Sequence, residues 1–349
     1  MEVQPGRTLQ NLYHSLVIIV LLFWILVIGR SLFVPLFYGL FIAIVLFPFC
    51  KKMEANGLPK LLSVSIGLLM VTILFAALLT LLYFQLKALN KDMPLLIDAF
   101  QNLVTGFKSW ASTKLSIPVT FQERLFQKLN SLESLFSKDS IRSTLSYSAN
   151  TMYVLYLSPV FAALFLYNRN TFVEAVVHIN AFTNKIAVRS ALKEIVHTYS
   201  SFIKGMIKVY VIVGSLNSLG LLILGIPHAI AFGYTTAIMT IIPYIGILLS
   251  ALLPISVAWL TTGSLLYPFG VILIFTFVQY LEGNIIFPKV VGVQLKISTW
   301  ATLVAIIAGG ILWGVSGMIL FIPFLGILKI ICSYVPGLKP IEILIGRRK

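Results

Sequence analysis

The feature that most constrains this chain is a long stretch without charge. From Val209 to Leu281 the sequence holds no Asp, Glu, Lys or Arg, and most of its residues are Leu, Ile, Val, Ala, Phe and Gly. A membrane-spanning helix needs only about 20 apolar residues to cross about 30 Å of hydrocarbon. A soluble protein of this size would carry charged residues on the exposed faces of such helices. The stretch therefore predicts an integral membrane protein.

Composition agrees with this class. Hydrophobic residues make up 59% of the chain and charged residues 11%, whereas soluble domains carry roughly 25% charged residues. We predict an all-α polytopic fold with about eight transmembrane helices. The first is expected to stay attached, because no small-residue cleavage site follows residues 15–29. The other windows without charge are 31–50, 61–86, 143–168 and 297–328.

The chain is basic, with 26 Lys and Arg against 11 Asp and Glu. On a soluble protein this balance would suggest nucleic acid as a partner. Here the charges sit mainly in loops and tails, which fits the preference of cytoplasmic loops for Lys and Arg. We therefore expect the lipid bilayer as a partner and no nucleic acid. Cys50 and Cys332 lack partner spacing, so neither a disulfide framework nor a metal cluster is expected.

The charge pattern divides the chain into alternating regions. We predict an N-terminal membrane region with three helices (1–86), an amphipathic helical insert (87–145), a fourth helix (146–167) and a cytoplasmic amphipathic segment (168–208). A C-terminal membrane core with broken helices (209–331) and a basic tail (332–349) follow. Helices five to eight are expected at about 209–224, 229–259, 266–281 and 299–331. Lys51, Lys52 and Lys60 mark the loop after the second helix as cytoplasmic, and the tail returns the C-terminus to that side.

Two features leave alternatives open. The insert 87–145 carries two apolar stripes at helical spacing, so it packs on itself, on a neighbouring subunit in a homo-oligomer, or on the membrane surface. Its side of the membrane stays open, because long segments largely escape the charge rule. Lys289 and Lys296 fall in a loop that this scheme places outside. A broken or re-entrant segment between residues 229 and 300 would account for them.

The string IIPYIG (Ile241–Gly246) interrupts the predicted sixth helix. Pro243 frees the carbonyl four residues earlier, and in lipid that group needs a partner, which Thr240 or Tyr244 is placed to supply. One interpretation is an unwound element lining a substrate path, as in transporters with interrupted helices. The other is a packing kink, and the pattern leaves both open. Pro243, Tyr244 and Gly246 are therefore candidate pathway residues.

A second candidate lies at the end of the predicted seventh helix, where Gln279, Glu282 and Asn284 precede Pro288. Gln279 and Glu282 are three residues apart, so they share one helix face. An acid at this place is either an interfacial cap or a buried site that couples transport to protons or cations. Glu282 is the best acidic candidate, because no other carboxylate lies so close to the long apolar block.

Gly309, Gly310, Gly314 and Gly317 place small residues at helical spacing, including one GxxxG pair from Gly310 to Gly314. Such faces let helices approach closely in a membrane. The pattern predicts helix packing rather than a ligand site.

The sequence predicts no enzyme, no cofactor and no metal site. Its four histidines lack ligand spacing with one another, with cysteines or with carboxylates. Residues 314–317 match the GxSG pattern of intramembrane serine proteases, but that chemistry takes a histidine from a later helix, and no histidine follows His228. Neither a P-loop string nor a zinc-binding HExxH string occurs.

Three runs in the last third of the chain resemble one known family: GIPHAIAFGYTTAIMTIIPYIGILLSALLP (225–254), QYLEGNIIFPKVVG (279–292) and AGGILWGVSGMILFIPFLGILK (308–329). Through about residues 200–330 the order and spacing resemble the autoinducer-2 exporter family, also called PerM-type permeases. The resemblance implies a bacterial inner-membrane protein with a transport role. The positions that match family motifs are Pro243, Tyr244, Gly246, Gln279, Glu282, Gly283, Pro288, Gly292, Gly309, Gly310, Gly314 and Gly317.

One departure from the family concerns a Leu-His-Pro string before the last helix, where this chain has Ile297–Thr299. A role for that His-Pro pair is not carried over. Because members are credited with different cargos, from a signalling molecule to sodium–proton exchange, membership does not identify the substrate. We expect a secondary transporter or exporter of a small solute or ion, with proton or sodium coupling as a hypothesis. The alternative is a non-transporting membrane scaffold whose insert binds a partner or drives oligomerisation.

Overall fold

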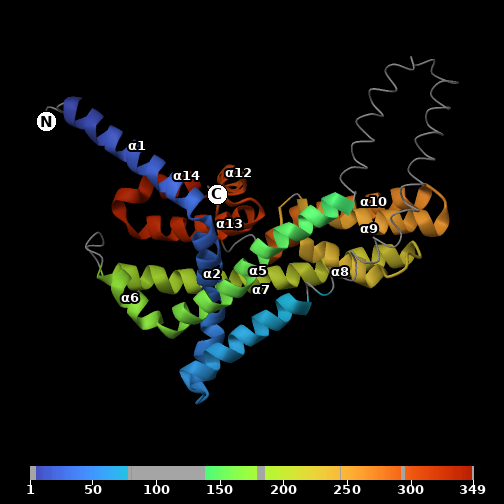
Figure 1. Cartoon of the computed structure of the whole chain (residues 1–349), viewed down its shortest axis with the longest axis horizontal. Coiled ribbons are helices and arrows are strands. Elements are labelled where there is room, and N and C mark those ends of the chain that lie inside the picture. Colours follow the sequence, from blue (N-terminus) through green and yellow to red (C-terminus); the bar gives the residue numbers. More distant parts are fainter. Residues whose placement is uncertain are drawn as a thin grey trace. The chain divides into compact units, whose positions relative to one another are not determined.

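The computed structural model describes residues 5–77, 80, 138–178, 185–243, 245–291 and 295–347. Over these residues the chain is built from helices, as Figure 1 shows. Five of the described helices are long and apolar enough to cross a membrane: Arg30–Ala55, Lys60–Ala77, Lys185–Ile223, Leu266–Val290 and Val315–Tyr334. The predicted all-α polytopic fold is confirmed. The insert 87–145 lies outside the described residues except for its last residues, which begin α5 (Lys138–Tyr167).

The chain forms two compact units, each assembled from separate stretches of sequence. Unit 1 comprises Met1–Met70, Val154–Lys204 and Gly292–Lys349, and unit 2 comprises Val71–Tyr153 and Gly205–Val291. The helix α7 (Lys185–Ile223) contributes to both. The amphipathic segment predicted before helix five therefore continues directly into that helix, as expected.

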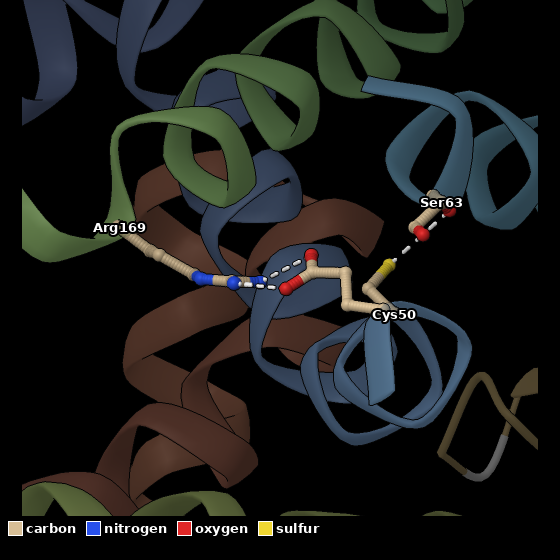
Figure 2. Close-up of polar contacts among 4 residues, drawn as sticks. Cys50, Ser63 and Arg169 are labelled. Carbon is tan, nitrogen blue, oxygen red and sulfur yellow. Dashed lines mark hydrogen bonds and ion pairs between the residues drawn. The ribbon is translucent and has the colours of Figure 1, made fainter. Parts of the chain in front are cut away.

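In the N-terminal part of unit 1, α1 (Pro5–Ile28) is followed by α2 (Arg30–Ala55). α2 crosses α5 at Gly39, where a Cβ would collide with Phe161. The helix Lys60–Ala77 is tied to α2 by Cys50, whose Sγ donates a hydrogen bond to the Ser63 carbonyl oxygen at 3.5 Å (Figure 2). α6 (Arg169–Val177) follows α5 after a single residue.

The core of unit 1 surrounds Tyr199 of α7, which is fully buried. It packs with Ala191, Ile195 and Ile330, and with Phe41 of α2. The Tyr199 hydroxyl donates a hydrogen bond to the Pro323 carbonyl oxygen, so a buried polar group on each side is satisfied. This contact joins α7 to α13 (Val315–Tyr334).

The predicted eighth helix, 299–331, is wrong as a single helix. The chain forms two helices, α12 (Thr299–Trp313) and α13, which pack on each other as a hairpin. Gly314 makes the turn with φ 60° and ψ −138°, a conformation open almost only to glycine.

The same hairpin explains the glycine pattern. Gly309 and Gly317 face each other across the two helices, and a Cβ on either would collide with the backbone of the other. Gly310 instead meets the Met318 side chain. The close approach of α12 and α13 occurs at Gly309 and Gly317, and not at the GxxxG pair ending at Gly314.

After α13, a 3₁₀ turn (Pro336–Leu338) leads into α14 (Lys339–Ile345). The tail then pairs with the segment before α12: the Ser298 amide donates to the Ile345 carbonyl oxygen at 2.8 Å, and the Arg347 amide donates to the Lys296 carbonyl oxygen at 2.9 Å. Because α12 and α13 form a hairpin, Lys296 and the tail lie at the same end of unit 1.

Unit 2 contains the rest of α7 and a series of packed helices: α8 (Ala229–Met239), α9 (Ile245–Thr262), α10 (Leu266–Leu281), η1 (Glu282–Ile286) and α11 (Phe287–Val290). Its core is formed by Leu221, Phe232, Leu253, Val271, Phe275 and their neighbours. The predicted sixth helix is broken between Met239 and Ile245, as Pro243 indicated.

Candidate functional site

Glu282 is the one charged side chain that is buried in the described part of the chain, with 8% of its surface exposed. It begins η1, a π-helical turn that joins α10 to α11. π-helical turns inside longer helices are rare and are frequent at functional sites, because the extra residue redirects the side chains of that turn. Here it places a carboxyl group inside unit 2, within the span Leu266–Val290.

The carboxyl group of Glu282 is only partly satisfied. The Gln279 side chain lies one turn earlier on the same stretch, next to this carboxyl group. Its Oε2 atom and the Oε1 atom of Gln279 are buried and have no hydrogen-bond partner in the described residues. A buried polar group without a partner is costly, and in a membrane segment an ionisable group of this kind marks an ion or proton path by default.

α7 supplies the opposite wall of this site. α7 and the stretch from α10 to α11 run antiparallel: a Cβ on Gly205 would lie 3.0 Å from the Val290 carbonyl oxygen, and one on Gly220 would collide with Ile274. Between these two contacts, Tyr210 of α7 lies within the range of an electrostatic interaction with Glu282. Glycines at both contacts allow this close approach of apolar helices.

α8 also packs on α7. The Ser215 hydroxyl of α7 lies 2.9 Å from the Tyr234 hydroxyl of α8, and the Ser218 hydroxyl donates to the Ile230 carbonyl oxygen at 3.3 Å. Close to these contacts, Asn217 of α7 and Thr236 of α8 are buried, and the Asn217 Oδ1 and Thr236 Oγ1 atoms have no hydrogen-bond partner within the described ranges.

We call the residues Tyr210, Asn217, Thr236, Gln279 and Glu282 the polar seam. All five belong to unit 2: Tyr210 and Asn217 lie on α7, Thr236 lies on α8, and Gln279 and Glu282 lie on the stretch from α10 to α11. Each except Tyr210 carries a buried oxygen without a partner in the described structure. Such oxygens can coordinate a cation or accept hydrogen bonds from water or a polar solute, and the carboxylate of Glu282 can also bind a proton.

The other predicted site residues lie elsewhere. Asn284 is exposed and its Nδ2 atom donates to the Tyr280 carbonyl oxygen at 3.0 Å, and Pro288 is exposed as well. Pro243 and Gly246 lie at the break between α8 and α9, and Tyr244 lies outside the described residues. The glycines at 309, 310, 314 and 317 belong to unit 1.

The break at Pro243 satisfies its backbone differently from the prediction. The carbonyl freed by Pro243 is that of Met239, and it accepts from the Ile242 amide at 3.0 Å. The Thr240 hydroxyl donates to the Ala237 carbonyl oxygen at 2.7 Å instead. Gly246 packs so closely on the Met239 carbonyl that a Cβ would collide with it, which fixes the return of the chain into α9.

Sequence reasoning identified Gln279 and Glu282 but missed Tyr210, Asn217 and Thr236. A usable pattern was present for Asn217, because Asn217 and Gln279 are the only amide side chains between residues 209 and 281. No sequence pattern distinguishes Tyr210 or Thr236, since residues with hydroxyl groups occur throughout residues 209–281. Within the described residues, no group of three His, Cys, Asp or Glu is placed to hold a metal ion.

Comparison with known proteins agrees with these observations. The sequence profile described as AI-2E family transporter matches residues 15–337. The chain is 23% identical to the candidate transport protein YrrI of Bacillus subtilis (strain 168) over 318 residues, which cover 88% of this chain and 87% of YrrI. It is 24% identical to the AI-2 transport protein TqsA of Escherichia coli (strain K12) over 323 residues, which cover 91% of this chain and 90% of TqsA.

The long apolar helices and their family match define a multi-pass membrane protein of the transporter class. Within that class, the chain belongs to the AI-2E transporter family.

Proposed function

We propose that the protein is a secondary transporter that moves a small solute or ion across the bacterial inner membrane, with the polar seam as part of its pathway. The observation that carries this proposal is the buried Glu282 carboxyl group, whose Oε2 atom has no partner in the described residues. A carboxyl group in this position binds and releases a proton or a monovalent cation as the path opens to either side. Family membership supports the transport role.

Orientation is part of the same proposal. The basic residues at the α2–α6 corner lie together, and Lys296 lies beside the C-terminal tail. We assign both groups to the cytoplasm by the preference of cytoplasmic loops for Lys and Arg. Both termini are then cytoplasmic. The scaffold alternative depends on the insert 87–145, most of which lies outside the described residues.

The test is flux in proteoliposomes that hold the full-length protein under an imposed sodium or proton gradient. We expect gradient-dependent flux in the wild type and a loss of at least tenfold in Glu282→Gln, which keeps the size of the side chain and removes its charge. The matched control is Asn284→Ala, because Asn284 lies two residues later but is exposed. Equal flux in wild type and Glu282→Gln would remove Glu282 from the mechanism.

A further inference from the structure

A cavity of about 280 Å³ lies in unit 1, and its lining holds none of the polar-seam residues. Three helices form it: the C-terminal end of α2, the whole first half of α6, and the first turns of α7. Three of its lining residues are cations, one is an acid, and two are apolar: Lys51, Arg169, Arg189, Glu174, Phe47 and Val173.

Arg169 is held in place before any ligand arrives. Its Nη1 atom donates to Glu54 Oε1 at 2.9 Å, and its Nη2 atom pairs with Glu54 Oε2, so the two side chains form a two-pronged ion pair. Figure 2 shows the Arg169 side chain reaching from α6 toward the end of α2. The guanidinium also lies 5.4 Å from the centre of the Phe47 ring. A guanidinium has five N–H donors, so this arrangement leaves donors free to face the cavity.

Lys51 and Arg189 line the same cavity without a carboxylate partner. In the described part of the chain, ion pairs form only between Arg169 and Glu54 and between Lys339 and Glu342. The Asn170 side chain also lines the cavity and adds an amide donor. Glu174 opposes one positive charge, and the charge of Arg169 is balanced by Glu54. The cavity therefore keeps a net positive charge and several convergent donors, which is the chemistry that binds phosphate.

The position of the cavity indicates which class of phosphate compound it binds. Lys51 lies near the end of the span Arg30–Ala55, and Lys52 and Lys60 flank the same loop. The ends of spanning helices lie at the depth of the lipid headgroups. The apolar walls formed by Phe47 and Val173 suit the glycerol and acyl region next to a headgroup phosphate. Basic pockets beside spanning helices bind anionic lipid headgroups by this combination of contacts.

We propose that this cavity binds the phosphate of an anionic phospholipid headgroup through Lys51, Arg169 and Arg189. Arg169 is the preorganised ligand, since its ion pair with Glu54 fixes its direction. Lys51 and Arg189 supply the unbalanced charge that distinguishes an anionic headgroup from a zwitterionic one. The site links α2, α6 and α7, so an occupied cavity stabilises the association of these three helices.

The experiment measures lipid binding to the purified full-length protein in detergent, by native mass spectrometry and by the shift in unfolding temperature. The probes are short-chain phosphatidylglycerol, short-chain phosphatidylcholine and inorganic phosphate. We expect phosphatidylglycerol to bind and to raise the unfolding temperature, phosphatidylcholine to bind at least tenfold more weakly, and inorganic phosphate to have little effect at the same concentration. Binding of inorganic phosphate as tight as that of phosphatidylglycerol would overturn the lipid assignment and indicate a site for a soluble phosphate compound.

The variant that tests the site is Lys51→Gln combined with Arg189→Gln, and we expect it to weaken phosphatidylglycerol binding at least tenfold. The matched control is Lys185→Gln combined with Lys193→Gln, because both residues lie one turn from Arg189 on α7 and outside the cavity lining. An equal loss in both double variants would show diffuse attraction to charge and would overturn the site. If the first double variant does not fold, Arg189→Gln alone replaces it: this change removes both the charge and the planar fork, and unchanged phosphatidylglycerol binding would exclude Arg189 as a phosphate ligand.

Discussion

Asn217 lies on α7 with 2% of its surface exposed, and its amide oxygen has no hydrogen-bond partner in the described residues. A buried acceptor without a partner costs about 1–3 kcal/mol. We therefore predict that Asn217→Leu keeps or raises the unfolding temperature in detergent, while it lowers transport severalfold by removing a polar group from the pathway. The control is Ser256→Ala on α9, where the exposed hydroxyl bonds only to the Leu252 carbonyl oxygen. Lower stability with normal transport in Asn217→Leu would assign Asn217 to the fold instead.

Unlike the amide oxygen of Asn217, the buried hydroxyl of Tyr199 has a hydrogen-bond partner. Tyr199→Phe leaves the Pro323 carbonyl oxygen without this donor inside the core of unit 1. We predict a loss of about 1–3 kcal/mol in the free energy of unfolding, measured by denaturant titration in detergent. Tyr334→Phe is the comparison, since its hydroxyl donates to Glu194 at 2.7 Å at the surface. A loss in Tyr334→Phe as large as that in Tyr199→Phe would contradict the argument from burial.

At the scale of single residues, the sequence located the charged member of the polar seam but not its neighbours. Glu282 was predictable because a carboxylate beside a charge-free block is unusual. Tyr210 lies beside it only because Gly205 and Gly220 let α7 pack closely on α10 and α11. That contact joins segments about 70 residues apart, and no local pattern encodes it.

The hairpin of α12 and α13 shows the same limit at the scale of elements. Residues 297–328 are uncharged throughout, so hydropathy does not distinguish one long helix from two antiparallel ones. The glycines suggested a packing face on a single helix, whereas Gly314 is the turn itself. The break at Pro243 was predictable, because proline acts on its own helix through a missing donor.

Gly314→Ala tests the hairpin. A Cβ at φ 60° and ψ −138° is strained whatever the space around it, although no atom lies within 4 Å of its position. We predict a loss of about 1–3 kcal/mol in the free energy of unfolding. Gly337→Ala is the control, because a Cβ there also meets open space and the backbone of Gly337 has no positive φ. Equal stability of the two variants would mean that the turn does not require glycine.

At the scale of the whole molecule, the charge pattern predicted the basic end but misplaced Lys296. The misplacement followed from counting α12 and α13 as one crossing, which put the segment before α12 on the side opposite to the tail. Backbone hydrogen bonds join Lys296 and Ser298 to the tail, so the two lie together. The Glu54–Arg169 pair joins α2 to α6, and the Tyr334–Glu194 hydrogen bond joins the end of α13 to the first half of α7, which lines one cavity with α2 and α6.

This arrangement predicts that Lys60, Asn170 and Lys339 face the same compartment. Each position is replaced by cysteine in turn and labelled with a membrane-impermeant maleimide, in intact cells and in inside-out vesicles. The parental chain is the control, and its label should be low because Cys50 and Cys332 are both buried. We expect all three variants to react in inside-out vesicles and to be protected in intact cells, because loops rich in Lys and Arg prefer the cytoplasmic side. Labelling of Lys339→Cys from outside, with Lys60→Cys labelled from inside, would contradict the shared compartment. Labelling of all three from outside would keep the shared compartment and reverse the orientation.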